Sequence, residues 1–252
     1  MNQFNRSYAP RGAAAGSMDM SVDAGLRAFM LGVYNKLALG LALSALLAAA
    51  TVYFAPLRDA LYVISPSGQF QGMTLLGTII QWSPLVMIFI AMFAMRNPSP
   101  RQAGALYWAF VSTIGLGLGV WAFIYTGESL ATTFFVTAAA FGGLSLFGYT
   151  TKRDLSGMGS FLIMGVIGLV LAMIVNMFLQ SPALMFAISA IGVLIFSGLI
   201  AYDTQRLKHT YYALGGDQAA MNVATSFGAL SLFINFINLF QFLLMFMGGS
   251  RE

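Results

Sequence analysis

The sequence predicts an all-α polytopic membrane protein, on the evidence of its composition and of the spacing of its charges. Of the 252 residues, 59% are hydrophobic and 8% are charged, whereas a soluble domain has about a quarter charged residues and about half apolar ones. Long stretches carry no charge at all, such as those from Asp154 to Asp203 and from Asp217 to Arg251. A helix needs about 20 apolar residues to cross the hydrocarbon core of a bilayer. These stretches are therefore long enough to hold membrane-spanning helices.

The N-terminal segment differs from the rest of the chain. Residues 1–26 are small, polar and without hydrophobic periodicity, so we expect a mobile cytoplasmic tail before a transmembrane domain over residues 27–250. The apolar stretch that follows the tail begins too late and is too long for the hydrophobic region of a secretory signal. We expect the first helix over about 28–54 and the second over about 73–95, with a kink at Pro84.

Five more apolar stretches follow and bring the predicted number of helices to seven. They cover about 103–125, 129–149, 160–179, 183–203 and 223–247. The charge-free stretch after Asp154 is too long for one span and holds two, which only QSPA separates, so these two helices form a tight hairpin. Gly115 and Gly119 are a pair of small residues four positions apart, which permits a neighbouring helix to approach closely.

The distribution of Lys and Arg predicts the orientation. With the N-terminus in the cytoplasm, the cytoplasmic segments hold Arg6, Arg11, Arg27, Lys36, Arg96, Arg101, Lys152, Arg153, Arg206 and Lys208. The outer segments hold only Arg58 and Arg251. This bias favours a cytoplasmic N-terminus and, after seven spans, an external C-terminus, unless the last segment is re-entrant and returns inside. The net charge of +4 then reflects cytoplasmic loops and does not indicate a nucleic-acid partner.

Several chemistries are excluded by the residues present. The chain has no cysteine, which excludes disulfides, thiolate metal sites and a cysteine nucleophile. Its single histidine, His209, lies in a predicted loop and does not suit an intramembrane serine protease. The last span lacks the lysine of a retinal pigment, and no phosphate loop, zinc motif or paired carboxylate occurs. We therefore expect no enzyme and no cofactor, apart from transient Ca²⁺.

Three ionisable residues lie at or inside predicted spans, namely Lys36, Arg96 and Asp203. The long side chains of Lys36 and Arg96 can reach the head groups by snorkelling. The side chain of Asp203 is too short for that. Either it faces the bundle interior and marks an ion or proton path, or the helix stops at Tyr202 and the carboxylate is solvated, paired with Arg206.

A polar stripe marks the last predicted span. Ser231, Asn235 and Asn238 lie at i, i+4 and i+7 and share one helix face. Amides in the middle of a span are costly unless they find partners. The stripe is therefore either a hydrogen-bond seam between helices or the lining of a polar path, with Asn235 near its midpoint.

The segments GLIAYDTQRLKH and ALSLFINFINLF resemble the Bax inhibitor-1 family, as do the loop GYTTKRDLSGMG and the segment MIFIAMFAMR. The likeness covers about residues 27–250. It implies a fold of seven helices in which six surround the last. The sequence carries no eukaryotic retention motif, which favours a multi-pass protein of a bacterial inner membrane.

The resemblance also implies a pH-sensitive leak of calcium, with a sensor of two aspartates. The first aspartate maps onto Asp203 and the second onto Asn235, while an arginine that latches onto the first maps onto Arg96. Two nearby carboxylates share a proton, but Asn235 cannot titrate, so we expect a sensor with a single aspartate. Ser231 stands where some relatives carry another aspartate. With fewer carboxylates, a calcium site that uses Asp203 as a ligand is expected to be weak.

Three functions remain as expectations. The first is a leak path for calcium or other cations across the lipid bilayer, lined by Asp203, Asn235, Ser231 and Asn238, with Arg96 as gate partner. The second is a non-conducting interaction protein that modulates a membrane protease or a stress response, because some bacterial relatives are regarded as modulators of such a protease. Residues 1–26 or the loop over 204–222 would then contact the partner. The third is proton-coupled transport of a small solute.

Overall fold

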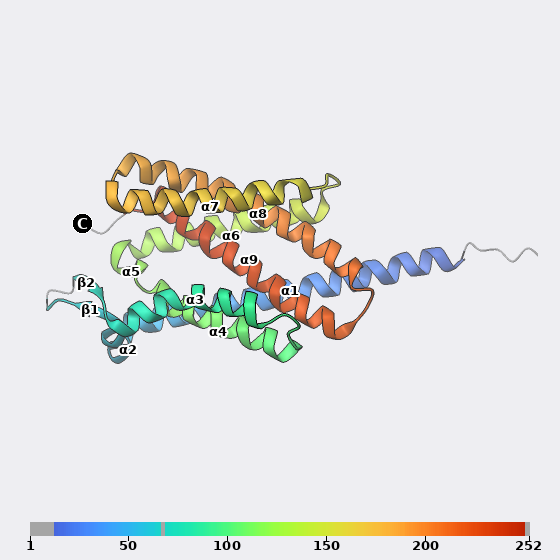
Figure 1. The fold of residues 1–252 in the computed structure, drawn as a ribbon, viewed down its shortest axis with the longest axis horizontal. Coiled ribbons are helices and arrows are strands. Elements are labelled where there is room, and N and C mark those ends of the chain that lie inside the picture. Colours follow the sequence, from blue (N-terminus) through green and yellow to red (C-terminus); the bar gives the residue numbers. More distant parts are fainter. Residues whose placement is uncertain (1–12, 67–68, 250–252) are drawn as a thin grey trace, which may run out of the picture.

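A computed structural model describes residues 13–66 and 69–249, which form a bundle of long helices (Figure 1). The helices are α1 (Ala13–Tyr53), α2 (Ala55–Leu61), α3 (Leu75–Ala94), α4 (Pro100–Leu118), α5 (Trp121–Ile124), α6 (Gly127–Thr150), α7 (Ser156–Leu179), α8 (Pro182–Ala213) and α9 (Gln218–Met247). In the described part of the chain, 6 helical segments are long and apolar enough to cross a membrane, and the apolar part of α3, Leu75–Ala91, is shorter. The predicted all-α polytopic membrane fold is confirmed, while the count of seven spans stays a prediction.

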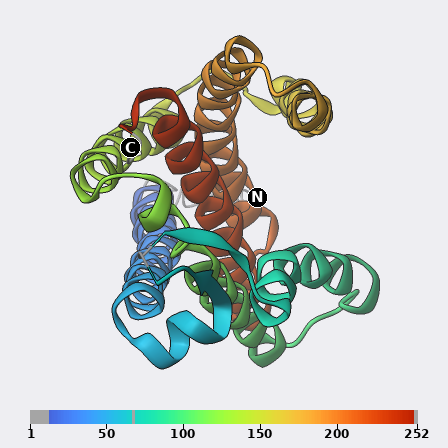
Figure 2. The same cartoon turned by 90° about the vertical axis from the view of Figure 1, so that its left-hand side faces the viewer.

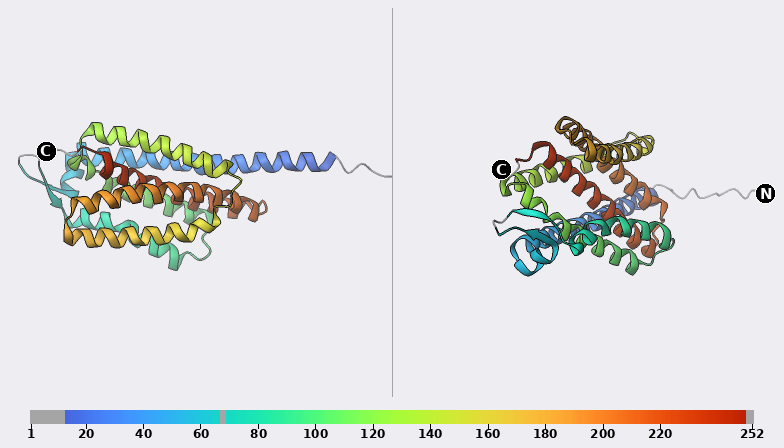
Figure 3. Two further views of the ribbon diagram at one scale, coloured as in Figure 1. Left: turned by 90° about the horizontal axis from the view of Figure 1, so that it is seen from above. Right: turned by 60° about the vertical axis from the view of Figure 1, so that its left-hand side comes forward.

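The long helices run between two ends of the bundle (Figure 1). One end carries the loops that follow α3, α6 and α8, and we call it the basic end because Arg96, Lys152 and Arg153 lie in these loops. The opposite end, called the hairpin end, carries α2, α5, a short β-hairpin and the C-terminal end of α9. At the basic end α1 extends beyond the other helices (Figures 1 and 3).

Helix α9 lies at the centre of the bundle. It packs against α8, α1, α4 and α6, and a larger share of its apolar window is buried than in any other span of the described chain. Helix α3 packs mainly on α4, and α7 mainly on α8, so both lie on the outside when the bundle is seen from the hairpin end (Figure 2). Of the six helices predicted to surround the last one, four pack against α9, while α3 and α7 lie at the periphery.

The hairpin is an element that the sequence analysis did not predict. Strands β1 (Tyr62–Ile64) and β2 (Phe70–Met73) pair in antiparallel fashion. The buried Tyr62 donates a hydrogen bond to the carbonyl of Leu116 at 2.9 Å and its ring packs edge-on against Phe70 and Phe123. These contacts fix the hairpin over the end of α4.

The first helix begins earlier than predicted. Of the expected tail, residues 1–12 lie outside the described residues, whereas the chain is helical from Ala13 and continues without a break into the first span. The boundary expected at residue 26 is therefore not a helix boundary.

Helix α8 continues beyond its predicted end. Asp203 was expected to close this helix, but the helix runs on to Ala213. The polar extension has partners that stabilise it: Gln205 accepts a hydrogen bond from the backbone N–H of Leu155 and donates one to the carbonyl of Arg153, each at 2.8 Å. Asp203 therefore lies inside a helix, against neighbouring helices, and not at a solvated helix end.

The predicted close approach at the glycine pair of α4 is confirmed. Helix α4 packs against α1, and a Cβ atom on Gly115 would lie only 2.7 Å from the Cα atom of Ser44. A Cβ atom on Gly119 would overlap the side chain of Thr51. Small residues at both positions let the two helix backbones approach each other.

Candidate functional site

A buried carboxylate meets the polar stripe where α8 packs on α9. Asp203 is 4% exposed, and its Oδ2 atom accepts hydrogen bonds from the hydroxyl of Ser231 and from Nδ2 of Asn235, the latter at 2.8 Å. Arg206 lies one turn further along α8, with a guanidinium nitrogen 3.0 Å from Oδ1 of Asp203 and 3.4 Å from the oxygen of Ser231. We call these four residues the carboxylate cluster.

Helix periodicity explains why these residues meet. Asp203 and Arg206 are three positions apart on α8, so their side chains share one face. Ser231 and Asn235 are four positions apart on α9 and share the face that packs against α8. Two donors on one helix therefore face an acceptor on the other, and Ser231 and Asn235 form a hydrogen-bond seam with Asp203.

The cluster limits the cost of burying a charge. A carboxylate inside an apolar bundle is costly unless it is paired and hydrogen-bonded. Here one guanidinium and two neutral donors occupy both oxygens of Asp203. The side chain of Arg206 is 50% exposed and that of Asp203 6%, so the ion pair bridges the buried interior and the more accessible surface near the basic end.

Two of the predicted site residues lie outside the cluster. Arg96, the expected latch on Asp203, is exposed in the loop after α3, and within the described residues the ion pair of Asp203 is made by Arg206 instead. Asn238 donates its hydrogen bond to the carbonyl of Ile234 on its own helix, at 2.8 Å. The sequence predicted Arg206 as the partner of a solvated Asp203, whereas in the structure it pairs with a buried one.

Lys36 makes contacts with two neighbouring helices. It donates a hydrogen bond to Ser226 at 2.7 Å and its ammonium lies 5.2 Å from the centre of the Tyr107 ring. The hydroxyl of Tyr107 in turn donates to the carbonyl of Lys36 at 2.7 Å. This contact joins α1, α4 and α9, while the snorkelling of Lys36 to the head groups stays a prediction.

Two cavities lie along the face of α9 that carries Ser231 and Asn238. The larger, of about 370 Å³, lies between α3, α4 and α9, and Arg206 and Ser231 form part of its lining. The smaller, of about 30 Å³, lies nearer the hairpin end and is lined in part by Gln81, Thr113 and Gln241. The two glutamines were not predicted as site residues, although Gln241 follows Asn238 by three positions and so continues the stripe.

The cluster does not fit a resident calcium ion. Calcium takes about 6 to 8 oxygen ligands with several carboxylates among them. Asp203 is the carboxylate of the cluster, and in the part of the chain that the structure describes no group of three or more His, Cys, Asp and Glu residues could hold a metal ion. Both oxygens of Asp203 are occupied by Arg206, Ser231 and Asn235, so a cation would have to displace one of these partners.

Comparisons with known proteins match this chain over nearly its whole length. Residues 26–252 match the family model described as inhibitor of apoptosis-promoting Bax1. The chain is 66% identical over 252 residues to an uncharacterised protein of Caulobacter vibrioides, with 100% of each chain covered. It is 40% identical over 229 residues to the inner membrane protein YbhL of Escherichia coli, covering 90% of this chain and 94% of that one. A protein of Rickettsia prowazekii is 40% identical over 236 residues, with 94% and 95% covered.

Proposed function

Because this chain belongs to the Bax inhibitor-1 family, we propose that this integral membrane protein is a leak path for calcium or other cations, influenced by pH through a single aspartate. The observation that carries the proposal is the carboxylate of Asp203, which is buried between two apolar helices yet paired with Arg206, a residue that lines a cavity. Ionisable groups inside membrane bundles are costly and generally mark ion or proton paths.

The proposed path follows the stripe of α9. A cation enters the larger cavity near the basic end, meets Asp203 beside Arg206 and Ser231, and passes Asn238 towards the small polar cavity at Gln241. Between the cavities α4 presents apolar side chains, with Phe110 lining the larger and Ile114 the smaller. A hydrophobic constriction of this kind stops ions by excluding water. Conduction therefore requires α4 or α3 to move relative to α9.

In this proposal Arg206 is the gate partner, a role that the resemblance assigned to Arg96. Its guanidinium occupies Oδ1 of Asp203, so a cation that approaches the carboxylate competes with it. Protonation of Asp203 removes the negative charge that holds Arg206 in place. Both events loosen the contact between the Arg206 guanidinium and Asp203, which couples pH to cation entry.

The proposed topology places the basic end in the cytoplasm of a bacterium. The loops of this end carry Arg96, Lys152 and Arg153, and loops rich in Lys and Arg stay on the cytoplasmic side. With α3 counted as a crossing, the chain crosses seven times, so its C-terminus lies outside the inner membrane, at the hairpin end.

Calcium flux into dye-loaded proteoliposomes, measured at acidic and alkaline pH, tests the proposal. We expect Asp203→Asn to change the flux and to remove its pH dependence, and Asn235→Asp to steepen that dependence because it restores a second carboxylate. Asp154→Asn is the matched control, since Asp154 is an exposed carboxylate of the α6–α7 loop. It should behave like the parent protein.

Equal flux and an equal pH profile for the parent and Asp203→Asn would contradict the proposal. Absence of flux from the parent but not from Asn235→Asp would mean that the fold conducts only with two carboxylates. Absence of flux from the parent and from all variants, with folding confirmed by circular dichroism, would favour the non-conducting interaction protein. Co-purification of a membrane protease would then test that role.

A further inference from the structure

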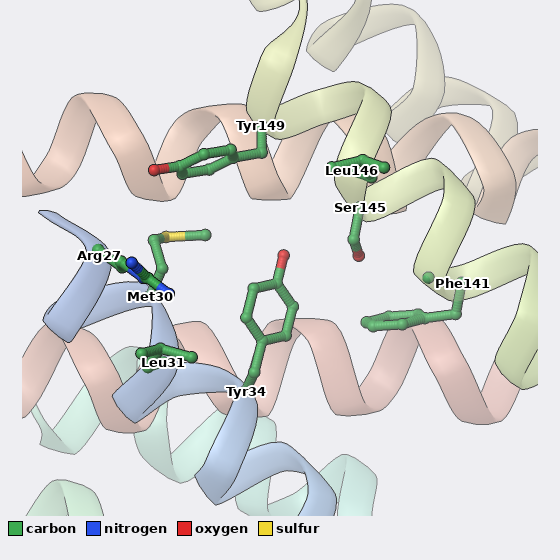
Figure 4. A pocket seen from close by; sticks show the side chains of 9 residues that line it. Arg27, Met30, Leu31, Tyr34, Phe141, Ser145, Leu146 and Tyr149 are labelled. Carbon is green, nitrogen blue, oxygen red and sulfur yellow. The ribbon is translucent and has the colours of Figure 1, made fainter. Parts of the chain in front are cut away.

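A groove separates α1 from α6 on the outside of the bundle. Both helices pack against α9 but make few contacts with each other. Two cavities of about 460 Å³ each lie in the gap between them, one nearer the basic end and one nearer the hairpin end. The first is lined by Arg27, Met30, Leu31 and Tyr34 of α1 and by Phe141, Gly142, Ser145, Leu146 and Tyr149 of α6 (Figure 4).

The first cavity opens sideways, towards the surface that faces the bilayer. Leu31 on one rim is 51% exposed and Leu146 on the other is 63% exposed, and both lie on helices long and apolar enough to span the membrane. The cavity ends towards the hairpin end at Phe141, whose ring lies 5.5 Å from that of Phe236 on α9. The opening therefore faces the lipid chains of the bilayer. Its apolar walls can accommodate one such chain.

One buried polar group of this cavity, the hydroxyl of Ser145, lacks a partner among the described residues. A buried hydroxyl without a partner costs free energy. Tyr34 directs its hydroxyl into the gap between the helices, from the side opposite Ser145 (Figure 4). The cavity thus offers hydrogen-bonding groups beside apolar walls, which fits a ligand with both kinds of surface.

Two cations lie near the basic end of the same cavity. Arg27 is exposed on its rim. Lys208 lies close by, donating a hydrogen bond to the carbonyl of Tyr149 at 2.9 Å with its ammonium 5.3 Å from the centre of that ring. Basic pockets between spans attract anionic lipid head groups, and arginine binds phosphate oxygens particularly well.

We propose that the groove between α1 and α6 binds an anionic phospholipid near the basic end. The phosphate lies against Arg27, the ester oxygens lie near the hydroxyls of Tyr34 and Ser145, and one acyl chain runs along Met30, Leu31 and Phe141. A cavity of about 460 Å³ falls within the range of about 300–1,000 Å³ that is typical of ligand sites. It holds one chain, while the rest of the lipid remains in the bilayer.

Lipid retention measured by native mass spectrometry tests whether the site prefers an anionic head group. The protein is delipidated in detergent and offered phosphatidylglycerol or phosphatidylcholine with identical acyl chains. We expect the parent to retain phosphatidylglycerol roughly fivefold more than phosphatidylcholine, since one cation near a lipid surface contributes about that preference. Arg27→Gln should abolish the preference. Arg101→Gln removes an exposed cation of α4 that does not line the cavity, so it should leave the preference unchanged.

A pair of variants at neighbouring glycines tests whether the lipid binds in this cavity. A Cβ atom on Gly142 or on Gly143 meets nothing within 4 Å, so both positions accept a side chain. Gly142 lines the cavity, whereas Gly143 does not. We expect Gly142→Phe to fill the cavity and to lower the retention of both lipids, and Gly143→Phe to retain them like the parent. Circular dichroism confirms that both variants are folded.

Equal retention of the two lipids by the parent, or full retention by Gly142→Phe, would overturn the proposal. A dimer of the parent that Gly142→Phe abolishes, with lipid retention unchanged, would identify the groove as an interface between copies of this chain and would overturn it as well. Retention is measured without ion flux, so the result does not depend on whether the protein conducts.

Discussion

Replacing Asn235 by leucine tests whether the bundle holds Asp203 as a charged group. Nδ2 of Asn235 lies 2.8 Å from Oδ2 of Asp203, and the two residues are 5% and 4% exposed. A hydrogen bond to a charged group contributes about 1.5–3 kcal/mol, whereas hydrogen bonds between helices in a membrane protein average about 0.6 kcal/mol. We expect Asn235→Leu to lower the free energy of unfolding by about 1.5–3 kcal/mol, because the carboxylate loses one donor and gains no substitute.

The assay is unfolding in mixed detergent micelles, followed by circular dichroism, with Asn238→Leu as the matched control. Among the described residues, the amide of Asn238 donates to the carbonyl of Ile234 on its own helix, so its loss should change the free energy of unfolding by no more than about 0.5 kcal/mol. A double-mutant cycle of Asn235→Leu with Asp203→Asn measures the part of this contact that depends on the carboxylate charge, because asparagine keeps an acceptor oxygen but carries no charge. A coupling of about 0.6 kcal/mol or less would refute the reasoning, since it would show an ordinary neutral contact.

Three further predictions concern stability. Gly115→Ala should lower the free energy of unfolding by about 1–3 kcal/mol, because its Cβ atom meets the backbone of Ser44 at 2.7 Å; unchanged stability in the same micelle assay would show that α1 and α4 can separate there. Gln205→Leu should speed hydrogen exchange in the α6–α7 loop, which loses two hydrogen bonds; unchanged protection would contradict this. The hydrogen bonds from the side chain and backbone of Ser156 lower the pKa of Asp154 from its ordinary value of 3.8. The stability that this group contributes is therefore complete above that value and lost as the pH falls through the lowered pKa, and Asp154→Asn should remove this acid dependence from the unfolding curve.

Some contacts of the site followed from helix periodicity alone. The spacing of Ser231 and Asn235 places both on one face, and amides in a span need partners, so a polar contact with another helix was predictable. The position of Asp203 at the end of a predicted span, and then the resemblance, indicated this carboxylate as a third member. The structure joins all three through hydrogen bonds to a single carboxylate oxygen.

Other features depend on contacts between distant parts of the chain, which periodicity does not report. Whether Asp203 ends a helix depends on Gln205, which holds the loop before α7 and so stabilises the extension of α8. That extension carries Arg206 to the carboxylate, in place of Arg96. The hairpin is likewise held by Tyr62, which bonds to the carbonyl of a residue in α4, far along the sequence.

The ion pair of the cluster has an electrical consequence. Asp203 and Arg206 belong to one helix and lie three positions apart, so a displacement of α8 carries both charges in the same direction. Moving one elementary charge through a potential of 100 mV involves about 2.3 kcal/mol, but an opposite pair that moves together transfers almost no net charge across the field. While the pair stays closed, the membrane voltage therefore does little work on a displacement of α8, and the field acts on these charges only when protonation of Asp203 or an entering cation separates them.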